Sequence, residues 1–178
     1  MRTIVVSWLS ILGLGWGAAQ AQQTQELPQP GPEHQRLGYF AGQWRFEGEM
    51  KEGPMGPGGP VTMSDRCEWF DGGFALVCHT EGQTPMGPAK GMGIMTYSPA
   101  KRAYTYYGID SMGFSDYATG QVEGDTWTYS SESEMEGKPI RTRVTIQEAS
   151  PTAYNFKFEL SVDGGPWVTT VEGTETKM

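Results

Sequence analysis

Two tyrosines and an aspartate near the middle of the chain are the side chains best suited to acid–base chemistry. Tyr104, Tyr106 and Asp110 lie on one alternating segment, so they share a face if that segment is a β-strand. Two phenols and a carboxylate on one face can orient a polar ligand group or serve as acid and base, as an isomerase or cyclase would need. The sequence favours a structural alternative, in which the phenols form an amphipathic wall and Asp110 caps the turn at Ser111 and Gly113.

Motifs of well-known enzyme classes are absent from the sequence. It has no G-x-S-x-G, no phosphate-binding glycine loop and no pair of histidines at metal-ligand spacing. His34 falls in a short N-terminal segment that we interpret as helical, with His34 as a surface or cap residue. His79 adjoins Cys78 on a predicted strand, so these two side chains face opposite ways and cannot form a nucleophilic couple. A catalytic role is therefore not the preferred interpretation.

Cys67 and Cys78 are the only cysteines, and an even number favours a disulfide in an exported protein. If the hairpin loop between them is Asp71–Phe74, Cys67 lies directly opposite Cys78, near bridging distance. A tighter Asp71-Gly72 turn would leave the two residues diagonal and about 7 Å apart. We predict the disulfide. Because it consumes both thiols and histidine is scarce, we also predict no tightly bound transition metal.

Methionine is frequent, with ten residues, and four of them fall in corresponding loops. If successive strands run up and down, the loops after the first, third, fifth and seventh strands meet at one end. These loops hold Met55, Met86, Met112 and Met135. Flexible thioethers form adaptable apolar binding surfaces, and they are also soft ligands for Cu(I). The plain alternative is two Pro-Met-Gly-Pro loops that happen to contain methionine.

An antiparallel sheet must position these side chains, because apolar and polar residues alternate from residue 42 to the C-terminus. Glycine- and proline-rich turns separate the alternating segments. We predict about ten strands, near residues 43–50, 60–70, 74–82, 90–97, 102–110, 114–123, 125–133, 139–148, 153–162 and 167–176. Tight hairpins between them favour a single up-and-down barrel in an all-β domain, with a two-sheet β-sandwich as the alternative.

The first part of the chain reads as an export signal followed by a linker. Residues 1–21 combine Arg2, an apolar core and an Ala-Gln-Ala cleavage site, as secretory signal peptides do. Residues 22–31 are polar and aperiodic, which predicts a disordered leader. Residues 32–41 predict a short helix that opens a barrel domain spanning 32–178. We therefore expect a periplasmic or secreted protein.

Charge and hydropathy exclude two classes of partner. The formal net charge is −8 and no cluster of Lys or Arg interrupts it, so the chain is not suited to nucleic acid or anionic lipid. The apolar stretch near the N-terminus is too short to span a bilayer comfortably, and no later segment comes close, so we predict no membrane span.

The order of several short motifs is similar to a known group of barrels. Gly42-Gln43-Trp44 after a short helix resembles the opening of lipocalins, where a G-x-W on the first strand plugs the closed end. The further motifs are Pro32–Leu37, Gly48-Glu49, Phe70–Phe74, Tyr97-Ser98-Pro99, Ile109-Asp110-Ser111 and Gly120 ahead of Trp127. In this order, residues 31–178 resemble a bacterial family of uncharacterised proteins, a domain of unknown function grouped with calycin-like barrels. The resemblance implies a barrel and brings no established activity.

The nitrobindin-like haem proteins are a second barrel family of similar shape. They place an axial histidine near the C-terminal end of the barrel, whereas this chain has only His34 and His79 and none in residues 154–178. The Cys-x-x-Cys-His attachment motif is absent as well. We therefore predict no haem and no other cofactor.

The preferred interpretation is an exported barrel that binds a small, largely apolar molecule through a methionine-bearing mouth. Candidate lining residues, besides the four loop methionines, are Trp44, Trp69, Tyr104, Tyr106, Asp110, Trp127, Phe156 and Phe158. The alternatives are an isomerase- or cyclase-type enzyme and a solidly filled barrel that acts through protein contacts at its loops. An internal void would distinguish the first two from the third, and a buried carboxylate with a raised pKa would favour the enzyme over the binding protein.

Overall fold

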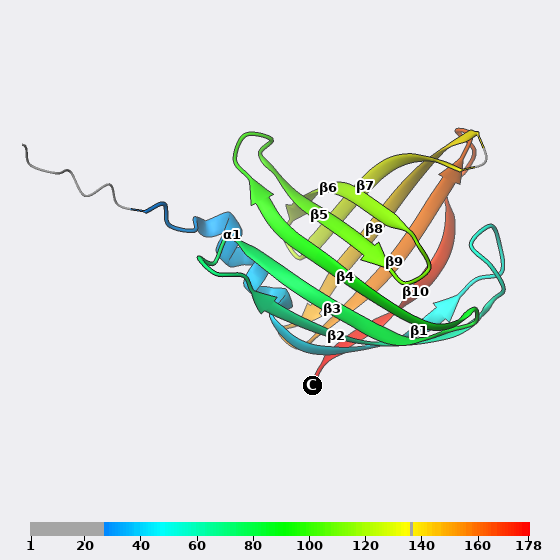
Figure 1. Ribbon diagram of the computed structural model, residues 1–178, viewed down its shortest axis with the longest axis horizontal. Coiled ribbons are helices and arrows are strands. Elements are labelled where there is room, and N and C mark those ends of the chain that lie inside the picture. The colour runs from blue at the N-terminus through cyan, green and yellow to red at the C-terminus, as the bar shows by residue number, and fades with distance from the viewer. Residues whose placement is uncertain (1–26, 136) are drawn as a thin grey trace, which may run out of the picture.

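Ten antiparallel strands close into one barrel (Figure 1). The computed structural model describes residues 27–135 and 137–178, so the predicted signal peptide and half of the predicted leader lie outside the described residues. The strands are β1 (Gly42–Met50), β2 (Gly59–Trp69), β3 (Ala75–Thr84), β4 (Gly87–Ser98), β5 (Ala103–Asp110), β6 (Ser115–Glu123), β7 (Thr126–Met135), β8 (Lys138–Ser150), β9 (Ala153–Val162) and β10 (Val168–Lys177). Each pairs with its neighbour in sequence, and β1 closes the barrel against β10. The predicted up-and-down barrel is confirmed.

The loop between β2 and β3 sets the register that joins the cysteines. Gly72 and Gly73 have φ values of 91° and 73°, a left-handed conformation that glycine adopts without strain. The loop occupies residues 70–74, and β2 then pairs with β3 so that Cys67 lies directly opposite Cys78. Their Cα atoms are 4.0 Å apart and the disulfide is formed, as predicted.

A short helical segment covers one end of the barrel, here called the closed end. The α-helix α1 (Pro32–Arg36) continues directly into the 3₁₀-helix η1 (Leu37–Phe40), so the predicted helix is in place but its second half is wound more tightly. Leu37 and Phe40 are buried against the inner side chains of the barrel. Trp44, the tryptophan of the G-x-W motif, donates its indole N–H to the carbonyl oxygen of Phe40 at 2.9 Å. The motif therefore seals this end.

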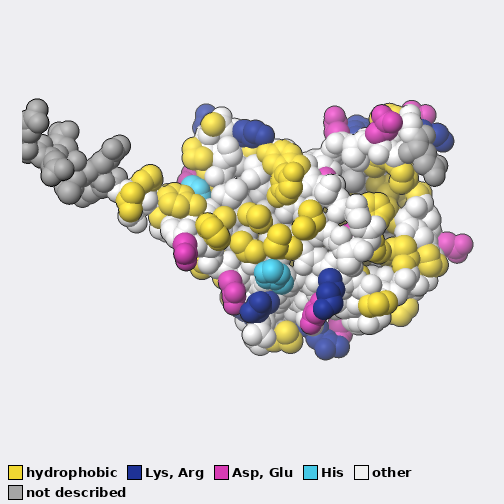
Figure 2. Space-filling model, viewed as in Figure 1, with side chains coloured by type: hydrophobic (Ala, Val, Ile, Leu, Met, Phe, Trp, Pro, Cys, Tyr) yellow, Lys and Arg dark blue, Asp and Glu magenta, His cyan; other side chains and the backbone are white. Residues whose placement is uncertain are grey.

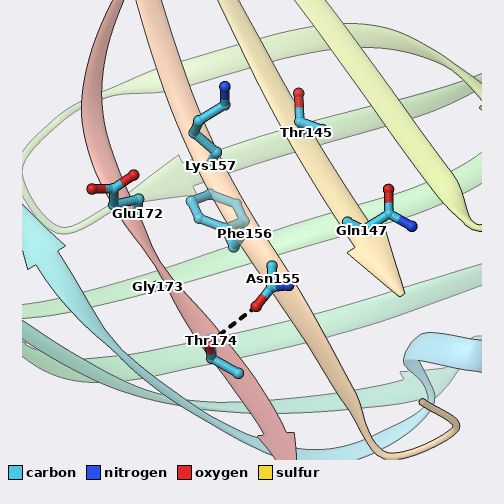
Figure 3. A pocket seen from close by; sticks show the side chains of 8 residues that line it. All are labelled: Thr145, Gln147, Asn155, Phe156, Lys157, Glu172, Gly173 and Thr174. Carbon is cyan, nitrogen blue, oxygen red and sulfur yellow. Dashed lines mark hydrogen bonds between the residues drawn. The ribbon is translucent and has the colours of Figure 1, made fainter. Parts of the chain in front are cut away.

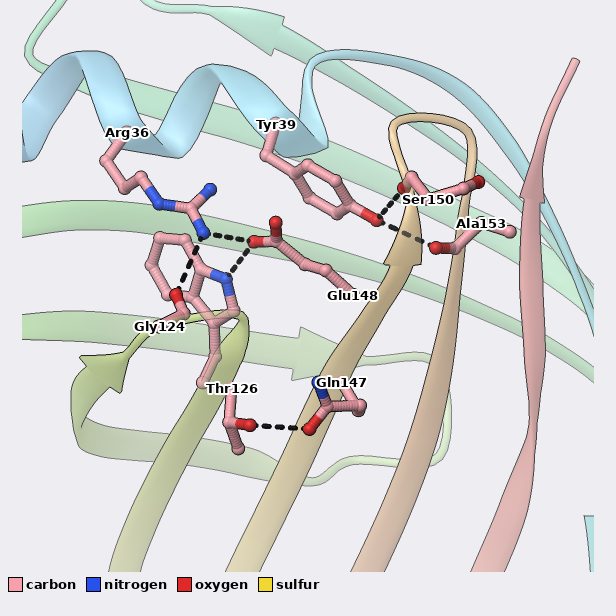
Figure 4. Close-up of polar contacts among 9 residues, drawn as sticks. Arg36, Tyr39, Gly124, Thr126, Gln147, Glu148, Ser150 and Ala153 are labelled. Atoms are coloured by element: carbon pink, nitrogen blue, oxygen red, sulfur yellow. Dashed lines mark hydrogen bonds and ion pairs between the residues drawn. The ribbon is translucent and has the colours of Figure 1, made fainter.

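An ion pair fixes the helix against β7 and β8 (Figure 4). The Arg36 Nη2 atom lies 2.6 Å from Glu148 Oε1, and that same oxygen accepts the indole N–H of Trp127 at 2.6 Å. The guanidinium group also stacks over the Trp127 ring, 4.9 Å from its centroid. Glu148 is largely shielded from solvent, so its charge depends on these two partners.

We expect Arg36→Met to lower the free energy of unfolding by about 2 kcal/mol, because Glu148 would lose its charged hydrogen-bond partner while staying shielded. Urea denaturation monitored by tryptophan fluorescence measures this change. Arg45→Met is the matched control, since the Arg45–Glu47 ion pair is exposed on both sides and should contribute less than about 0.5 kcal/mol. Equal losses in the two variants would contradict the anchoring role of Arg36.

No helix within residues 27–135 and 137–178 has the length and hydropathy needed to cross a bilayer.

Candidate functional site

Strand register identifies the side chains that point into the barrel. Residues directly opposite each other share a face, so the inner face can be followed from the buried Trp44 through every strand pair. In the middle of the barrel this face carries Met63, Asp65, Thr80, Tyr106, Val144, Phe156, Phe158, Val171 and Glu175. We call the space among these side chains the lumen.

Below the lumen, the closed end is packed solid with aromatic rings. Tyr104 and Trp127 have ring centroids 4.8 Å apart, and Trp44 and Tyr154 have centroids 5.0 Å apart. Trp44 and Trp127 are essentially inaccessible to solvent. Three of the predicted lining residues, Trp44, Tyr104 and Trp127, therefore form the floor beneath the lumen.

The lumen itself keeps solvent-accessible space. Tyr106, Val144, Phe156, Phe158 and Val171 point inward, yet each is only partly buried. Phe156 also borders a depression on the outer surface, beside Gly173. The closed sheet separates Tyr106, Val144, Phe158 and Val171 from the outer solvent, so their accessibility indicates space inside the barrel. The barrel is therefore not filled along its whole length.

Glycines on the wall explain how large rings leave room at the centre. The Tyr106 ring lies against Gly93 and Gly108, and a Cβ atom at either glycine would stand 2.7 Å from the ring. Phe46 lies over Gly48 in the same way, with a separation of 2.4 Å for a Cβ there. These rings lie flat along the wall because their neighbours have no side chains.

A pair of acids faces the lumen from two strands that flank β1. Asp65 on β2 accepts a hydrogen bond from the Thr80 hydroxyl and contacts the carboxyl of Glu175 on β10. Glu175 is only 6% exposed, and its Oε2 atom finds no hydrogen-bond donor among the described residues. Two carboxyl groups can bond to each other only with a proton between them. Contact between two buried carboxyl groups therefore favours the protonated form of Glu175.

Burial is the main cause of the raised pKa values of Asp65 and Glu175. It raises the pKa of Glu175 to about 9, and the negative charge of Asp65 adds to that rise. Burial also raises the pKa of Asp65. Near neutral pH Glu175 therefore holds its proton. A buried carboxyl with a raised pKa does exist in this barrel, but at Asp65 and Glu175 rather than at Asp110.

Two tyrosines near the pair remain neutral hydrogen-bond donors. Burial raises the pKa of Tyr106 and of Tyr154, and the nearby Asp65 carboxylate adds to the rise in both. The Tyr129 hydroxyl, on the inner face of β7, is also buried and has no hydrogen-bond partner among the described residues. The lumen therefore offers phenol hydroxyls that a bound molecule can use.

The predicted acid–base trio is divided between three environments. Tyr104 lies in the floor and Tyr106 lies on the lumen wall. The Asp110 Oδ1 atom accepts the backbone N–H groups of Met112 at 2.8 Å and Phe114 at 3.0 Å, so this carboxylate caps the turn between β5 and β6. The structure thus supports the structural interpretation of Asp110 that the sequence favoured.

The other predicted lining residues divide between the lumen and the barrel surface. Phe156 and Phe158 point into the lumen, where Phe156 packs against Phe46 with ring centroids 5.7 Å apart. Trp69 lies at the closed end beside Gly38 and is 41% exposed. A ligand role for each of these residues stays a prediction.

The four loop methionines lie at the end opposite the helix, which we call the mouth. Met86, Met112 and Met135 are exposed, and Met55 is partly buried in the loop between β1 and β2. A Cβ atom at Gly56 would lie 2.9 Å from the Met86 sulfur, so the loops after β1 and β3 touch. The predicted common location of these loops is thus observed.

The outer surface carries a depression and an apolar strip. A depression of about 410 Å³ lies over β8, β9 and β10, and its polar side chains point outward, with the Thr174 hydroxyl donating to Asn155 (Figure 3). Apolar side chains also gather over β3 to β5 (Figure 2). Ile94, Tyr107 and Tyr117, which lie side by side on β4, β5 and β6, are exposed. Such an apolar strip is typical of a contact surface.

The described part of the chain contains no cluster of side chains suited to bind a metal ion. Within residues 27–135 and 137–178, no group of three or more His, Cys, Asp or Glu side chains is placed to hold a metal ion. The predicted absence of a tight metal stays a prediction for elemental analysis.

Comparison with solved structures supports the fold alone. The chain is similar to Rv2717c from M. tuberculosis, with a TM-score of 0.60 and 13% identity over 84% of this chain and 99% of that one. It is also similar to the S-type phycobiliprotein lyase CPES from Guillardia theta, with a TM-score of 0.53 and 13% identity over 81% of this chain and 91% of that one. Both identities are too low to transfer a site.

Sequence comparison supplies the family. No curated protein matches the sequence significantly. The family described as "Protein of unknown function (DUF1579)" matches residues 29–177, which is nearly the whole barrel domain. The order of motifs from Gly42-Gln43-Trp44 onward had indicated a family of this kind. The chain belongs to the DUF1579 family of proteins of unknown function.

Proposed function

We propose that this protein is exported and that its barrel binds a small, largely apolar molecule in the lumen. One observation carries the proposal: inward-facing side chains between the packed floor and the mouth remain partly accessible to solvent. A concave space lined by aromatic and aliphatic side chains with few polar groups is typical of small-molecule sites. The methionine loops at the mouth supply an adaptable apolar entrance.

Export is supported by two independent features. Residues 1–21 carry the pattern of a secretory signal peptide. The Cys67–Cys78 disulfide suits an oxidising compartment, where such bonds form and persist. The proposed location is the periplasm or the extracellular space.

A lumen-filling substitution tests the binding proposal directly. Val144 points into the lumen and the adjacent Thr145 points outward, so Val144→Trp and Thr145→Trp add the same side chain to opposite faces of β8. We expect an environment-sensitive apolar dye to bind the wild type saturably, and Val144→Trp to weaken that binding by about tenfold or more, because the indole occupies the same space. Thr145→Trp should bind as the wild type does.

Circular dichroism should show that both variants are folded. Ser133→Trp, which places an indole on the inner face near the mouth, is a milder second blocking variant. Dye binding that is unchanged in Val144→Trp and Ser133→Trp would place the dye outside the lumen and overturn the proposal.

The four methionines at the mouth allow a separate prediction. Changing Met55, Met86, Met112 and Met135 together to Gln should weaken dye binding, since each thioether contributes roughly 1 kcal/mol of apolar contact. Oxidation to the sulfoxides should act similarly, because it makes the same surface polar. Thermal stability should hardly change, since most of these side chains are exposed. Fluorescence titration measures the affinity, and an unchanged value would show that entry does not involve the methionines.

An isomerase- or cyclase-type enzyme is the second candidate, and the buried acid pair is the observation that favours it. A carboxyl that stays protonated near neutral pH can donate a proton to a bound substrate. An enzyme would convert a molecule that co-purifies from the host, whereas a binding protein would return it unchanged. Mass spectra of that molecule before and after incubation with fresh protein distinguish the two.

A further inference from the structure

The charges that face the lumen have one sign. Between the floor and the mouth, the inner face carries the carboxyl groups of Asp65, Asp110, Asp116 and Glu175. Among the described residues, the lysines that share the inner face lie only at the two ends of the barrel. Lys138 pairs with Met135 at the mouth, and Lys177 lies at the closed end with its ammonium 5.2 Å from the Trp44 ring centroid. The lumen is therefore an acidic space without an internal counter-ion.

Hydrogen bonding at the acid pair is incomplete. The Thr80 hydroxyl serves Asp65, while Oε2 of the buried Glu175 has no donor from the described part of the chain. Protonation of Glu175 lessens the repulsion between the two carboxyl groups but supplies no donor from the described residues to its Oε2 atom. An ammonium group brings three donors and a positive charge, so it supplies what the pair lacks.

Aromatic rings flank the pair. On the strands beside β10, Phe46 and Tyr154 lie directly opposite Glu175 and share its inner face. Tyr106 adds a third ring from β5, close enough to Asp65 for that carboxylate to raise its pKa. Carboxylates surrounded by ring faces are the setting in which proteins hold organic cations.

We propose that Asp65 and Glu175 bind the protonated amine of a small organic cation whose apolar part lies against Phe46, Tyr106 and Tyr154 in the lumen. This inference rests on the proposed function and names the ligand class for that same site. The ammonium replaces the proton held by Glu175, which leaves with solvent, so both carboxyl groups are ionised in the complex. The aromatic rings and the flat glycine wall accommodate the rest of the molecule.

Two isosteric probes test the charge requirement: 1-naphthylmethylamine, which is protonated near neutral pH, and the neutral 1-naphthylmethanol. Isothermal titration of the mature wild type should show the amine binding about tenfold more tightly than the alcohol. Repeating the titration in buffers of different ionisation enthalpy should show proton release with the amine and none with the alcohol.

Three variants complete the test. Glu175→Gln and Asp65→Asn should each weaken amine binding by about tenfold and leave alcohol binding unchanged. Glu172→Gln, on the same strand but paired with Lys51 on the outer surface, should bind both probes as the wild type does. Glu175→Gln removes a buried ionisable group without changing its shape, so we expect it to fold.

The outcomes separate the inference from the proposed function. If the two probes bind equally or the amine releases no proton, the inference is wrong, while the proposed function stands provided that Val144→Trp weakens dye binding by about tenfold or more. If the dye binds but neither probe does, the inference is wrong in the same way. If neither the dye nor the probes bind, both proposals fail.

Discussion

Glu175→Gln is expected to make the protein more stable above neutral pH and to flatten the pH dependence of its stability. Burial raises the pKa of Glu175 to about 9, so between the unfolded carboxyl pKa, about 4.5, and that value the native state binds more protons than the unfolded state. The free energy of unfolding therefore falls as pH rises through this window, by at most about 1.4 kcal/mol per pH unit. A glutamine does not ionise, so this contribution disappears.

Thermal melts at pH 5 to pH 8, below the Glu175 pKa of about 9, measure the effect. The variant should melt at a higher temperature than the wild type at pH 8 and differ little at pH 5. Glu172→Gln, on the exposed side of β10, is the control and should follow the wild type throughout. Wild-type stability that rises with pH over this range, with a parallel curve for Glu175→Gln, would rule out a protonated Glu175 in the native state.

Another buried acid titrates outside this window. Burial alone would raise the pKa of Glu159, but hydrogen bonds from Arg143 and Lys157 outweigh it and lower the pKa. Its contribution to stability is present above the unfolded pKa and is lost only as pH falls below it. The decline toward pH 8 therefore belongs to the Asp65–Glu175 pair.

Loss of the Cys67–Cys78 disulfide should lower the free energy of unfolding by about 3 kcal/mol. The bond closes a loop with a sequence separation of 11, and the chain-entropy model gives that magnitude for a loop of this size. For a domain of this length the melting temperature should fall by about 10 °C. Melts of the wild type with and without reductant, beside the Cys67→Ala/Cys78→Ala variant, measure the change.

Reduced wild type and the double alanine variant should melt together, because both lack the crosslink. Thiol titration of the exported protein after denaturation gives a direct check of the bond. Two reactive thiols per chain would show that the disulfide does not form in the exported protein.

The strands and the cysteine pairing could be predicted because both depend on local sequence. A period of two along β8 and β9 decides which side chains are buried, and the glycines at 72 and 73 set the length of one hairpin. That hairpin alone places Cys67 opposite Cys78. The G-x-W motif likewise indicated which end the helix covers.

The acid pair was missed because its members meet only through barrel closure. Asp65 lies between the inward-facing Met63 and Cys67 at alternate positions of β2. A polar residue where the alternation predicts an apolar one was therefore the available signal in the sequence. On β10, Glu175 lies two residues after Gly173 and therefore shares its inner face. Neither position reveals a partner until β1 pairs with both β2 and β10.

The division of aromatic residues between floor and lumen also depends on tertiary structure. Trp44 and Trp127 belong to the floor because the helical segment packs Phe40 against them. Tyr106 stayed accessible because Gly93 and Gly108 let its ring lie along the wall. The alternation along a single strand does not distinguish these two outcomes.

Native mass spectrometry of the protein exported from its own host tests the central claim, a lumen that holds a small molecule, most directly. The wild type and Thr145→Trp should carry an additional small mass that is lost on unfolding. Val144→Trp, whose indole fills the lumen, should have the mass of the polypeptide alone. A bare polypeptide mass in the wild type, or the same additional mass in Val144→Trp, would contradict a ligand in the lumen.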